Sequence, residues 1–174
     1  MKDTLRYILG YCIGFLIFVV LIPYGLFELS QIDPIIKIKW PDYLIIRVIL
    51  SLPFFIVGLL FMIWSNLYLF FIGKGGPTDG FNIAITPRTK KLVVTGPYRY
   101  CRNPMVFGAF CLYFSLGFFM LSLLCLIVLM VFILLIILYL RKTEEKRLVK
   151  DFGNEFIEYK RKVPMLFPRI LTNK

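Results

Sequence analysis

Charged residues occur at only a few places along the 174-residue chain, and three long stretches between them carry no charge. These stretches cover residues 7–27, 48–72 and 105–140. Each is longer than the roughly 18 apolar residues that mark a candidate membrane-spanning helix. The first two stretches predict single spans at 5–29 and 44–72.

The third uncharged stretch is too long for one straight span. Its 36 residues would form a helix of about 54 Å at roughly 1.5 Å per residue, nearly twice the thickness of the hydrocarbon layer. Two spans fit if the chain reverses near Ser115, Gly117 and Ser122, small residues that also let helices approach closely. We therefore predict a tight helical hairpin over 104–141 and about four spans in all. One long tilted helix is the alternative, and it would place its flanking segments on opposite sides of the membrane.

The composition agrees with this pattern. Hydrophobic residues make up 59% of the chain, and the mean hydropathy is +0.80. Such values exceed those of soluble domains and predict an all-α integral membrane protein with a single membrane domain, 1–174. The first apolar run is longer than the core of a signal peptide and no small-x-small cleavage site follows it, so we interpret it as a retained anchor.

The positions of the basic residues predict the orientation. With four spans, 18 of the 21 Lys and Arg residues lie on the side that holds both termini and the loop 73–103. Lys37 and Lys39 lie on the other side, and Arg47 lies near the start of the second span. The positive-inside rule therefore places both termini and this loop in the cytoplasm. Anionic head groups account for the net charge of +11, so we expect no nucleic-acid partner.

Cysteine and histidine usage excludes several kinds of site. None of the four cysteines belongs to a C-x-x-C pair, and the chain has no histidine. We therefore expect neither a metal site nor a disulfide framework, and we interpret three of the cysteines as ordinary buried residues. The sequence leaves the oligomeric state open.

The loop 73–103 ends in the sequence GPYRYCRNPM, residues 96–105. Asn103 followed by Pro104 predicts a helix start, because the Asn side chain can accept a backbone N–H and proline suits the first helical position. Tyr98 and the basic residues beside it are typical of a membrane interface. These residue types alone fit a membrane-surface anchor and one wall of an active site equally well.

The segment 142–168 is predicted to be a cytoplasmic amphipathic helix that lies on the membrane or on the protein, with a kink at Gly153. Its apolar residues recur at helical spacing, at Leu148, Phe152, Phe156 and Tyr159. Glu144 and Glu145 precede them, and ion pairs on a solvated helix surface are their simplest role. The predicted hairpin, however, returns both carboxylates to the membrane depth of residues 98–103. Together these groups suit a zwitterionic ligand that carries an aromatic base.

From about residue 73 to 168 the chain resembles the membrane methyltransferases that include isoprenylcysteine carboxyl methyltransferase and the phospholipid N-methyltransferases. The matching pattern is KLVVTGPYRYCRNPM, a helical hairpin, and then EEKRLVKDFGNEFIEYKRKVP. The resemblance implies S-adenosylmethionine as the cofactor, enclosed between the loop and the membrane helices. Its implied contacts are Lys90, Lys91, Leu92, Val93, Tyr98, Asn103, Pro104, Met105, Val106 and Glu144, with Glu145 in support. Arg141 or Arg102 would hold an anionic substrate.

The chain differs from the eukaryotic carboxyl methyltransferases at three of these positions. Asn103 and Lys90 stand where those enzymes have or tend to have histidine, and Val106 stands where they usually have tyrosine. Many prokaryotic relatives share the RNP form, so the differences concern the substrate more than the cofactor.

The resemblance and the absence of histidine lead to one functional expectation with two alternatives. We expect methyl transfer to a lipid-like or prenylated acceptor from the bilayer, such as a prenylcysteine α-carboxyl, because a carboxylate needs no base. The nearest alternative is methylation of a phospholipid amine or of a small amine or thiol. The alternative from another class is a non-catalytic membrane protein that binds anionic lipid, with both polar motifs serving the fold only.

Overall fold

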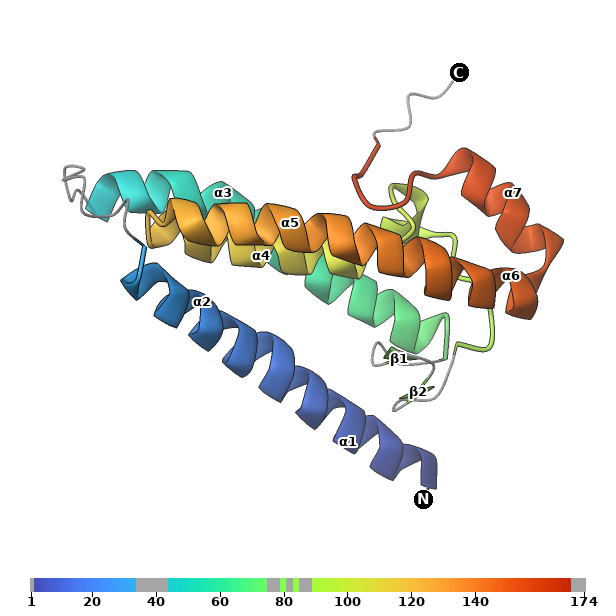
Figure 1. Cartoon of the computed structure of the whole chain (residues 1–174). Helices are drawn as coiled ribbons and strands as arrows, with labels where there is room; N and C mark the ends of the chain where they lie inside the picture. The colour runs from blue at the N-terminus through green and yellow to red at the C-terminus, as the bar shows by residue number, and fades with distance from the viewer. Residues whose placement is uncertain (1, 34–43, 75–78, 81–82, 85–88, 170–174) are drawn as a thin grey trace.

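A computed structural model describes residues 2–33, 44–74, 79–80, 83–84 and 89–169. Most of this part of the chain is helical (Figure 1). The predicted orientation also depends on Lys37, Lys39, Arg88 and Lys174, which lie outside the described residues. The elements in chain order are α1 (Lys2–Phe15), the π-helical η1 (Leu16–Leu21), α2 (Ile22–Gln31), α3 (Leu44–Phe71), β1 (Asp79–Gly80), β2 (Ile83–Ala84), the 3₁₀ helix η2 (Gly96–Arg99), α4 (Pro104–Phe119), α5 (Leu123–Tyr139), the π-helical η3 (Leu140–Glu144), α6 (Glu145–Phe152) and α7 (Asn154–Lys162).

The predicted all-α membrane fold is confirmed. Three described helical stretches are long and apolar enough to cross a membrane: Ile8–Gln31, Leu44–Phe71 and Leu123–Phe152. A shorter apolar helix, Pro104–Phe119, lies before the last of them. Its 16 residues extend about 24 Å, somewhat less than the roughly 30 Å of hydrocarbon. The only strands among the described residues are β1 and β2, which form a two-residue antiparallel ladder in the loop after α3.

The helical hairpin is also confirmed, and α4 and α5 are its two arms (Figure 1). The chain reverses at residues 120–122, at the end of the region predicted for the turn, while Ser115 and Gly117 lie buried within α4. The hydroxyl of Ser122 accepts a hydrogen bond from the backbone N–H of Cys125 at 3.2 Å and so caps α5. Ser122 also donates to the carboxylate of Asp33 at 2.7 Å, and the N–H of Leu124 donates to the same oxygen at 2.9 Å. These bonds fix the end of the first helix to the turn.

Two glycines allow α3 and α4 to pack backbone against backbone. A Cβ placed on Gly58 would lie 2.8 Å from the carbonyl oxygen of Gly108, and a Cβ on Gly108 would lie 2.9 Å from that of Gly58. Real Cβ atoms do not come this close, so neither position accepts a side chain unless the helices separate. This contact fixes the position of α4, and α4 begins at the site described below.

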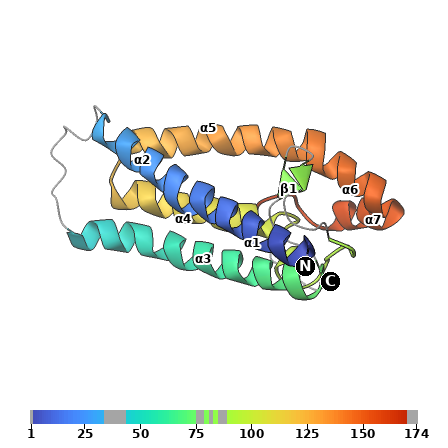
Figure 2. The same cartoon turned by 90° about the horizontal axis from the view of Figure 1, so that it is seen from below.

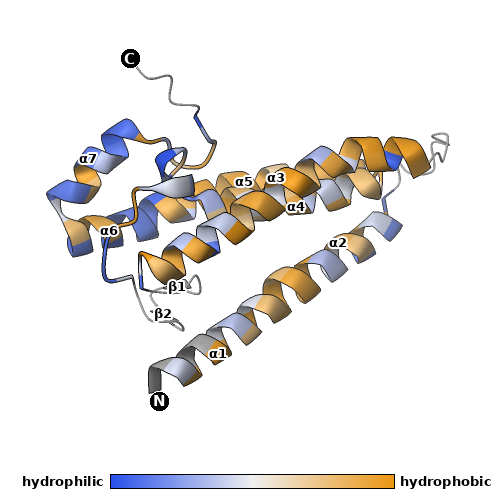
Figure 3. Cartoon of the chain, turned by 180° about the vertical axis from the view of Figure 1, so that it is seen from behind, coloured by the Kyte–Doolittle hydropathy of each residue, from blue (hydrophilic) through white to orange (hydrophobic). Residues whose placement is uncertain are grey.

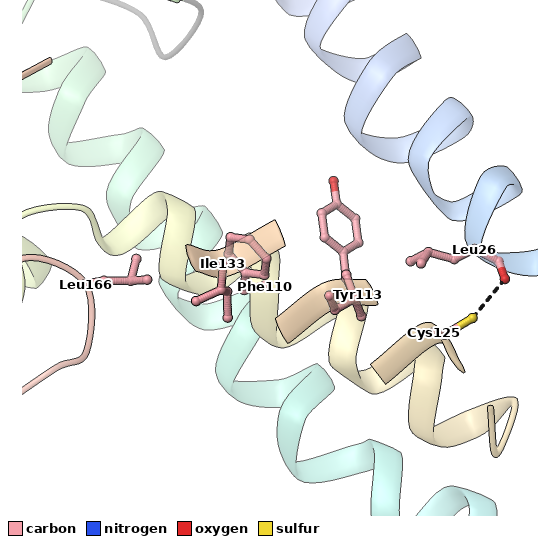
Figure 4. Close-up of a cluster of buried hydrophobic side chains, with 7 residues drawn as sticks. Leu26, Phe110, Tyr113, Cys125, Ile133 and Leu166 are labelled. Atoms are coloured by element: carbon pink, nitrogen blue, oxygen red, sulfur yellow. Dashed lines mark hydrogen bonds between the residues drawn. The ribbon is translucent and has the colours of Figure 1, made fainter. Parts of the chain in front are cut away.

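The first helix, which consists of α1, η1 and α2, contacts the other helices mainly through its second half. Leu26 belongs to a buried cluster with Phe110, Tyr113 and Cys125 from the hairpin (Figure 4). The thiol of Cys125 lies 3.2 Å from the carbonyl oxygen of Leu26, and the hydroxyl of Tyr113 donates to the carbonyl of Phe18 at 3.0 Å. Cys101, Cys111 and Cys125 are buried and Cys12 is exposed, which confirms three buried cysteines.

Several polar segments among the described residues gather at one end of the helices. The start of α1, the ladder of β1 and β2, and the pair α6 and α7 all lie at this end in two perpendicular views (Figures 1 and 2). Hydropathy changes along the same direction, because the bundle is mostly hydrophobic whereas much of α7 is hydrophilic (Figure 3). The exposed side chains of α3 and α5 are largely apolar, as membrane helices require.

Candidate functional site

A cavity of about 170 Å³ lies at the polar end of the bundle, where α4 begins. The end of α3, the segment before α4, the first turn of α4 and the helices from Glu144 onward all contribute to its wall. The lining residues are Leu69, Thr89, Leu92, Val93, Tyr98, Arg102, Asn103, Pro104, Met105, Val106, Glu144, Arg147, Leu148, Phe152, Phe156 and Tyr159. The hairpin therefore brings the two polar motifs of the sequence to one place.

The segment before α4 is held by the C-terminal end of the described chain. The backbone N–H of Arg102 donates to the carbonyl of Pro164 at 2.9 Å, and that of Asn103 donates to the carbonyl of Met165 at 3.0 Å. Farther on, the N–H of Arg169 donates to the carbonyl of Tyr100 at 3.0 Å. Residues 163–169, which we call the C-terminal strap, thus fix the backbone at one wall of the cavity.

Asn103 starts α4, as predicted, but its side chain does not cap the helix. Asn103 makes no capping bond within the described residues. Its amide nitrogen instead donates to the carbonyl of Met165 at 3.0 Å. The side chain therefore bonds to the strap and not to the first turn of α4, as the prediction of a cap required. This prediction was wrong because the competing carbonyl comes from a segment 62 residues away in sequence.

Glu144 and Glu145 occupy different environments although they are adjacent. The last span continues without a break through η3, where the N–H of Glu145 bonds to the carbonyl of Leu140 in the wider π-helical pattern. Such π-helical turns often occur at functional sites. Glu144 lines the cavity, with Arg147 at 4.0 Å from its carboxylate. Glu145 is buried behind the cavity wall and pairs with Arg102 and Lys160.

The helix predicted for 142–168 folds back on itself at Gly153. Gly153 has φ +55° and ψ −129°, a conformation that favours glycine, and it separates α6 from α7. The turn lets Phe156, Tyr159 and Val163 form a buried cluster against Leu92. The hydroxyl of Tyr159 donates to the carbonyl of Tyr98 at 2.6 Å, and Phe156 and Tyr159 both line the cavity, so α7 packs against the site.

Burial makes the hydroxyl and thiol groups next to the cavity poor bases and nucleophiles. Tyr98 is buried in the protein, not placed at the membrane interface as predicted, because the α7 cluster covers it. Desolvation raises the pKa of Tyr98 and of Tyr159 well above the usual range. It also raises the pKa of the fully buried Cys101 thiol to about 12. All three groups therefore stay protonated at neutral pH.

The structure brings most of the sequence-predicted site residues together. Those that line the cavity are Leu92, Val93, Tyr98, Arg102, Asn103, Pro104, Met105, Val106 and Glu144. Lys90, Lys91 and Arg141 are exposed and do not line it, whereas Thr89, beside the two lysines, does. This leaves Arg102, rather than Arg141, beside the cavity.

Several lining residues were not among the predicted site residues. Leu148, Phe152, Phe156 and Tyr159 were identified only as the apolar face of a helix, and their spacing is the signal that could have placed them here. No pattern in the sequence indicated the other three lining residues, which are Leu69, Thr89 and Arg147.

Residues 46–155 match the family model described as phospholipid methyltransferase. The chain belongs to this family. The match covers more than half of the chain and runs from α3 into the start of α7, so it includes residues 96–105 and the first part of the segment 142–168. Searches of the curated proteins and of the solved structures each found no match.

Family membership and fold together identify a multi-pass membrane methyltransferase. The matched region contains the hairpin and the residues that line the cavity, except Phe156 and Tyr159, whereas α1 and α2 lie outside it.

Proposed function

We propose that this cavity binds S-adenosylmethionine and that the chain transfers its methyl group to an amphiphilic acceptor from the bilayer. The observation that carries the proposal is the convergence of one carboxylate, Glu144, and two arginines, Arg102 and Arg147, in a mainly apolar cavity. A carboxylate suits the ammonium and sulfonium charges of the cofactor, and apolar residues such as Leu92, Val93 and Phe156 suit its adenine ring.

The buried polar groups of the cavity fit this ligand. Nε of Arg102 is buried and has no hydrogen-bond partner among the described residues, so the site offers an unused donor to an anionic group. The cavity volume of about 170 Å³ is below the roughly 300–1,000 Å³ of typical small-molecule sites. A complete nucleoside cofactor must therefore extend beyond the enclosed space or widen it on binding.

Methyl transfer from a sulfonium depends more on the relative position of the two reactants than on acid or base groups of the protein. The cofactor supplies a methyl group on a sulfonium, and the acceptor atom replaces the sulfur, which leaves as a neutral thioether. Glu144 would hold the positively charged end of the cofactor, and Arg102 would hold an anionic group. Tyr98, Asn103 and the first residues of α4 would fix the rest, because the strap and α7 hold them rigidly.

A carboxylate on a lipid-like molecule, such as a prenylcysteine α-carboxyl, is the acceptor that we favour. A carboxylate is ionised at neutral pH and attacks without losing a proton, and the chain has no histidine to act as a base. Arg102 lines the cavity just before α4 begins, where an amphiphile can place its polar head. The acceptor would enter from the bilayer and the cofactor from the aqueous side.

A phospholipid amine is the second candidate, favoured by the description of the matching family. An ammonium group must lose a proton before it attacks. Glu144 is the carboxylate that lines the cavity and would have to accept this proton, since Tyr98 stays protonated.

Labelled product distinguishes the two acceptors. Purified protein is incubated with S-adenosylmethionine labelled in the methyl group and with host membranes, and the lipids are then extracted. We expect label in the lipid fraction that mild base releases as methanol, because an ester hydrolyses whereas an N-methyl amine does not. Label that resists base would select the amine. No label in any lipid or lipidated protein would contradict methyl transfer to an amphiphile.

We also infer that both termini and the loop after α3 face the cytoplasm. The start of α1, the ladder in this loop and α6–α7 lie at the same end of the bundle (Figures 1 and 2). Reporters fused after Lys174 and inserted in the loop 73–103 are expected to give the same cytoplasmic signal. Signals from opposite sides would contradict the orientation.

A further inference from the structure

Glu145 is shared by two cations from different elements. Arg102, two residues before α4, forms an ion pair with one oxygen of its carboxylate. Lys160, on α7, forms an ion pair with the other oxygen and donates a hydrogen bond to it. The side chains of Arg102 and Glu145 are 10% and 7% exposed, whereas that of Lys160 is 46% exposed. The cluster therefore joins a buried pair to a partly solvated lysine.

The two cations exceed the single carboxylate by one positive charge. A buried charge is costly unless it is paired, so this excess requires an anion or contact with water. Lys160 is largely open to water, whereas the Nε of Arg102 is buried and lacks a hydrogen-bond partner among the described residues. Arg102 lines the cavity, while Glu145 and Lys160 do not. The positive charge that lacks a partner anion is therefore on Arg102, at the cavity wall.

We propose that Lys160 is a positioning residue that keeps Arg102 available to an anionic group in the cavity. Lys160 partly neutralises Glu145 from outside, so that Glu145 orients Arg102 without using all of its charge and donors. Without Lys160, the carboxylate could form a complete two-bond pair with the guanidinium, which is the strongest arrangement open to both groups. Arg102 would then have less affinity for a ligand. This inference rests on the proposed function, because it needs the cavity to hold the reacting molecules.

Two anionic groups have the required chemistry, a carboxylate on the cofactor and a carboxylate or phosphate on the acceptor. S-adenosylhomocysteine carries the cofactor carboxylate, and 5′-methylthioadenosine shares its nucleoside and thioether but lacks the amino-acid part. Comparing the two compounds reports on the cofactor carboxylate. A total lipid extract of the host, presented in detergent micelles, reports on the acceptor.

A purely structural role for Lys160 makes different predictions. If the lysine only joined α7 to α6, its loss would destabilise the protein and weaken the binding of every ligand to the same extent. α7 is held independently by the buried Phe156 and by the 2.6 Å bond from Tyr159 to Tyr98, so we expect it to stay in place without Lys160.

The test compares Lys160→Met, Lys160→Arg and Lys162→Met in the full-length detergent-solubilised protein. Lys162 is an exposed cation on the same helix and is the matched control. If Arg102 holds the cofactor carboxylate, Lys160→Met is expected to lower the affinity for S-adenosylhomocysteine by about tenfold or more. Its effect on the affinity for methylthioadenosine should be less than about twofold. If Arg102 holds the acceptor, nucleoside binding is unchanged and the half-saturating concentration of lipid extract rises by about tenfold. In both cases Lys160→Arg restores the wild-type value and Lys162→Met does not change it.

Three results would overturn the inference. The first is that Lys160→Met leaves both readouts unchanged. The second is that Lys160→Met weakens the binding of both nucleosides equally and lowers the melting temperature. The third is that Lys160→Arg fails to restore the lost binding. Failure of the proposed function looks different, because the wild-type protein itself would then bind neither nucleoside.

Discussion

Replacing Glu144 by glutamine is expected to weaken S-adenosylhomocysteine binding by about 10- to 100-fold, the range given by a loss of roughly 1.5–3 kcal/mol for one charged hydrogen bond. Glu144 is the carboxylate that lines the cavity, and Gln keeps its size but not its charge. The rate of methyl transfer at limiting cofactor should fall by at least the same factor. Calorimetric titration and the labelled-methyl assay measure the two effects.

The control for this change is Glu158→Gln, which removes the same charge from an exposed position on α7 outside the cavity. We expect wild-type binding and rate from it. If Glu144→Gln binds S-adenosylhomocysteine as tightly as Glu158→Gln does, the assignment of Glu144 is wrong.

Replacing Gly108 by valine is expected to cost about 3 kcal/mol or more of stability, at the upper end of overpacking effects. The new Cβ would lie 2.9 Å from two backbone atoms of α3, the carbonyl oxygen of Gly58 and the nitrogen of Met62. Backbone atoms within a helix cannot move individually, so α3 and α4 must separate. Since α4 begins at the cavity, ligand binding should be lost together with the fold.

Gly25→Ala is the matched control, because nothing lies within 4 Å of a Cβ at this position of α2. It should be neutral or slightly stabilising, since alanine favours helices by roughly 1 kcal/mol over glycine. Thermal melting in detergent and retention on gel filtration compare the two variants. Equal melting temperatures would show that α3 and α4 do not touch as described.

The sequence predicted those features that depend on composition and length. Uncharged runs located the spans, and the excess length of the run 105–140 required the hairpin. Once the hairpin was in place, Glu144 had to return to the depth of Tyr98 and Arg102, and the structure puts all three around one cavity. These inferences need only the helical rise and the thickness of a membrane.

The features that the sequence missed depend on contacts between distant segments. Asn103 has the chemistry of a helix cap, and nothing near it in sequence indicates that its side chain donates to the carbonyl of Met165 instead. Tyr98 has the chemistry of a membrane interface, yet α7 buries it after the break at Gly153. Lys160 looks like one of several cations on a solvated helix, and only the fold places it on Glu145.

The most direct test of the cofactor site is the melting temperature of the detergent-solubilised wild-type protein with and without S-adenosylhomocysteine. A ligand that binds only the folded state stabilises it by about 2.7 kcal/mol at one hundred times its dissociation constant. We predict a melting temperature that rises with ligand concentration and saturates. No change at millimolar ligand, for protein that melts cooperatively, would contradict the account.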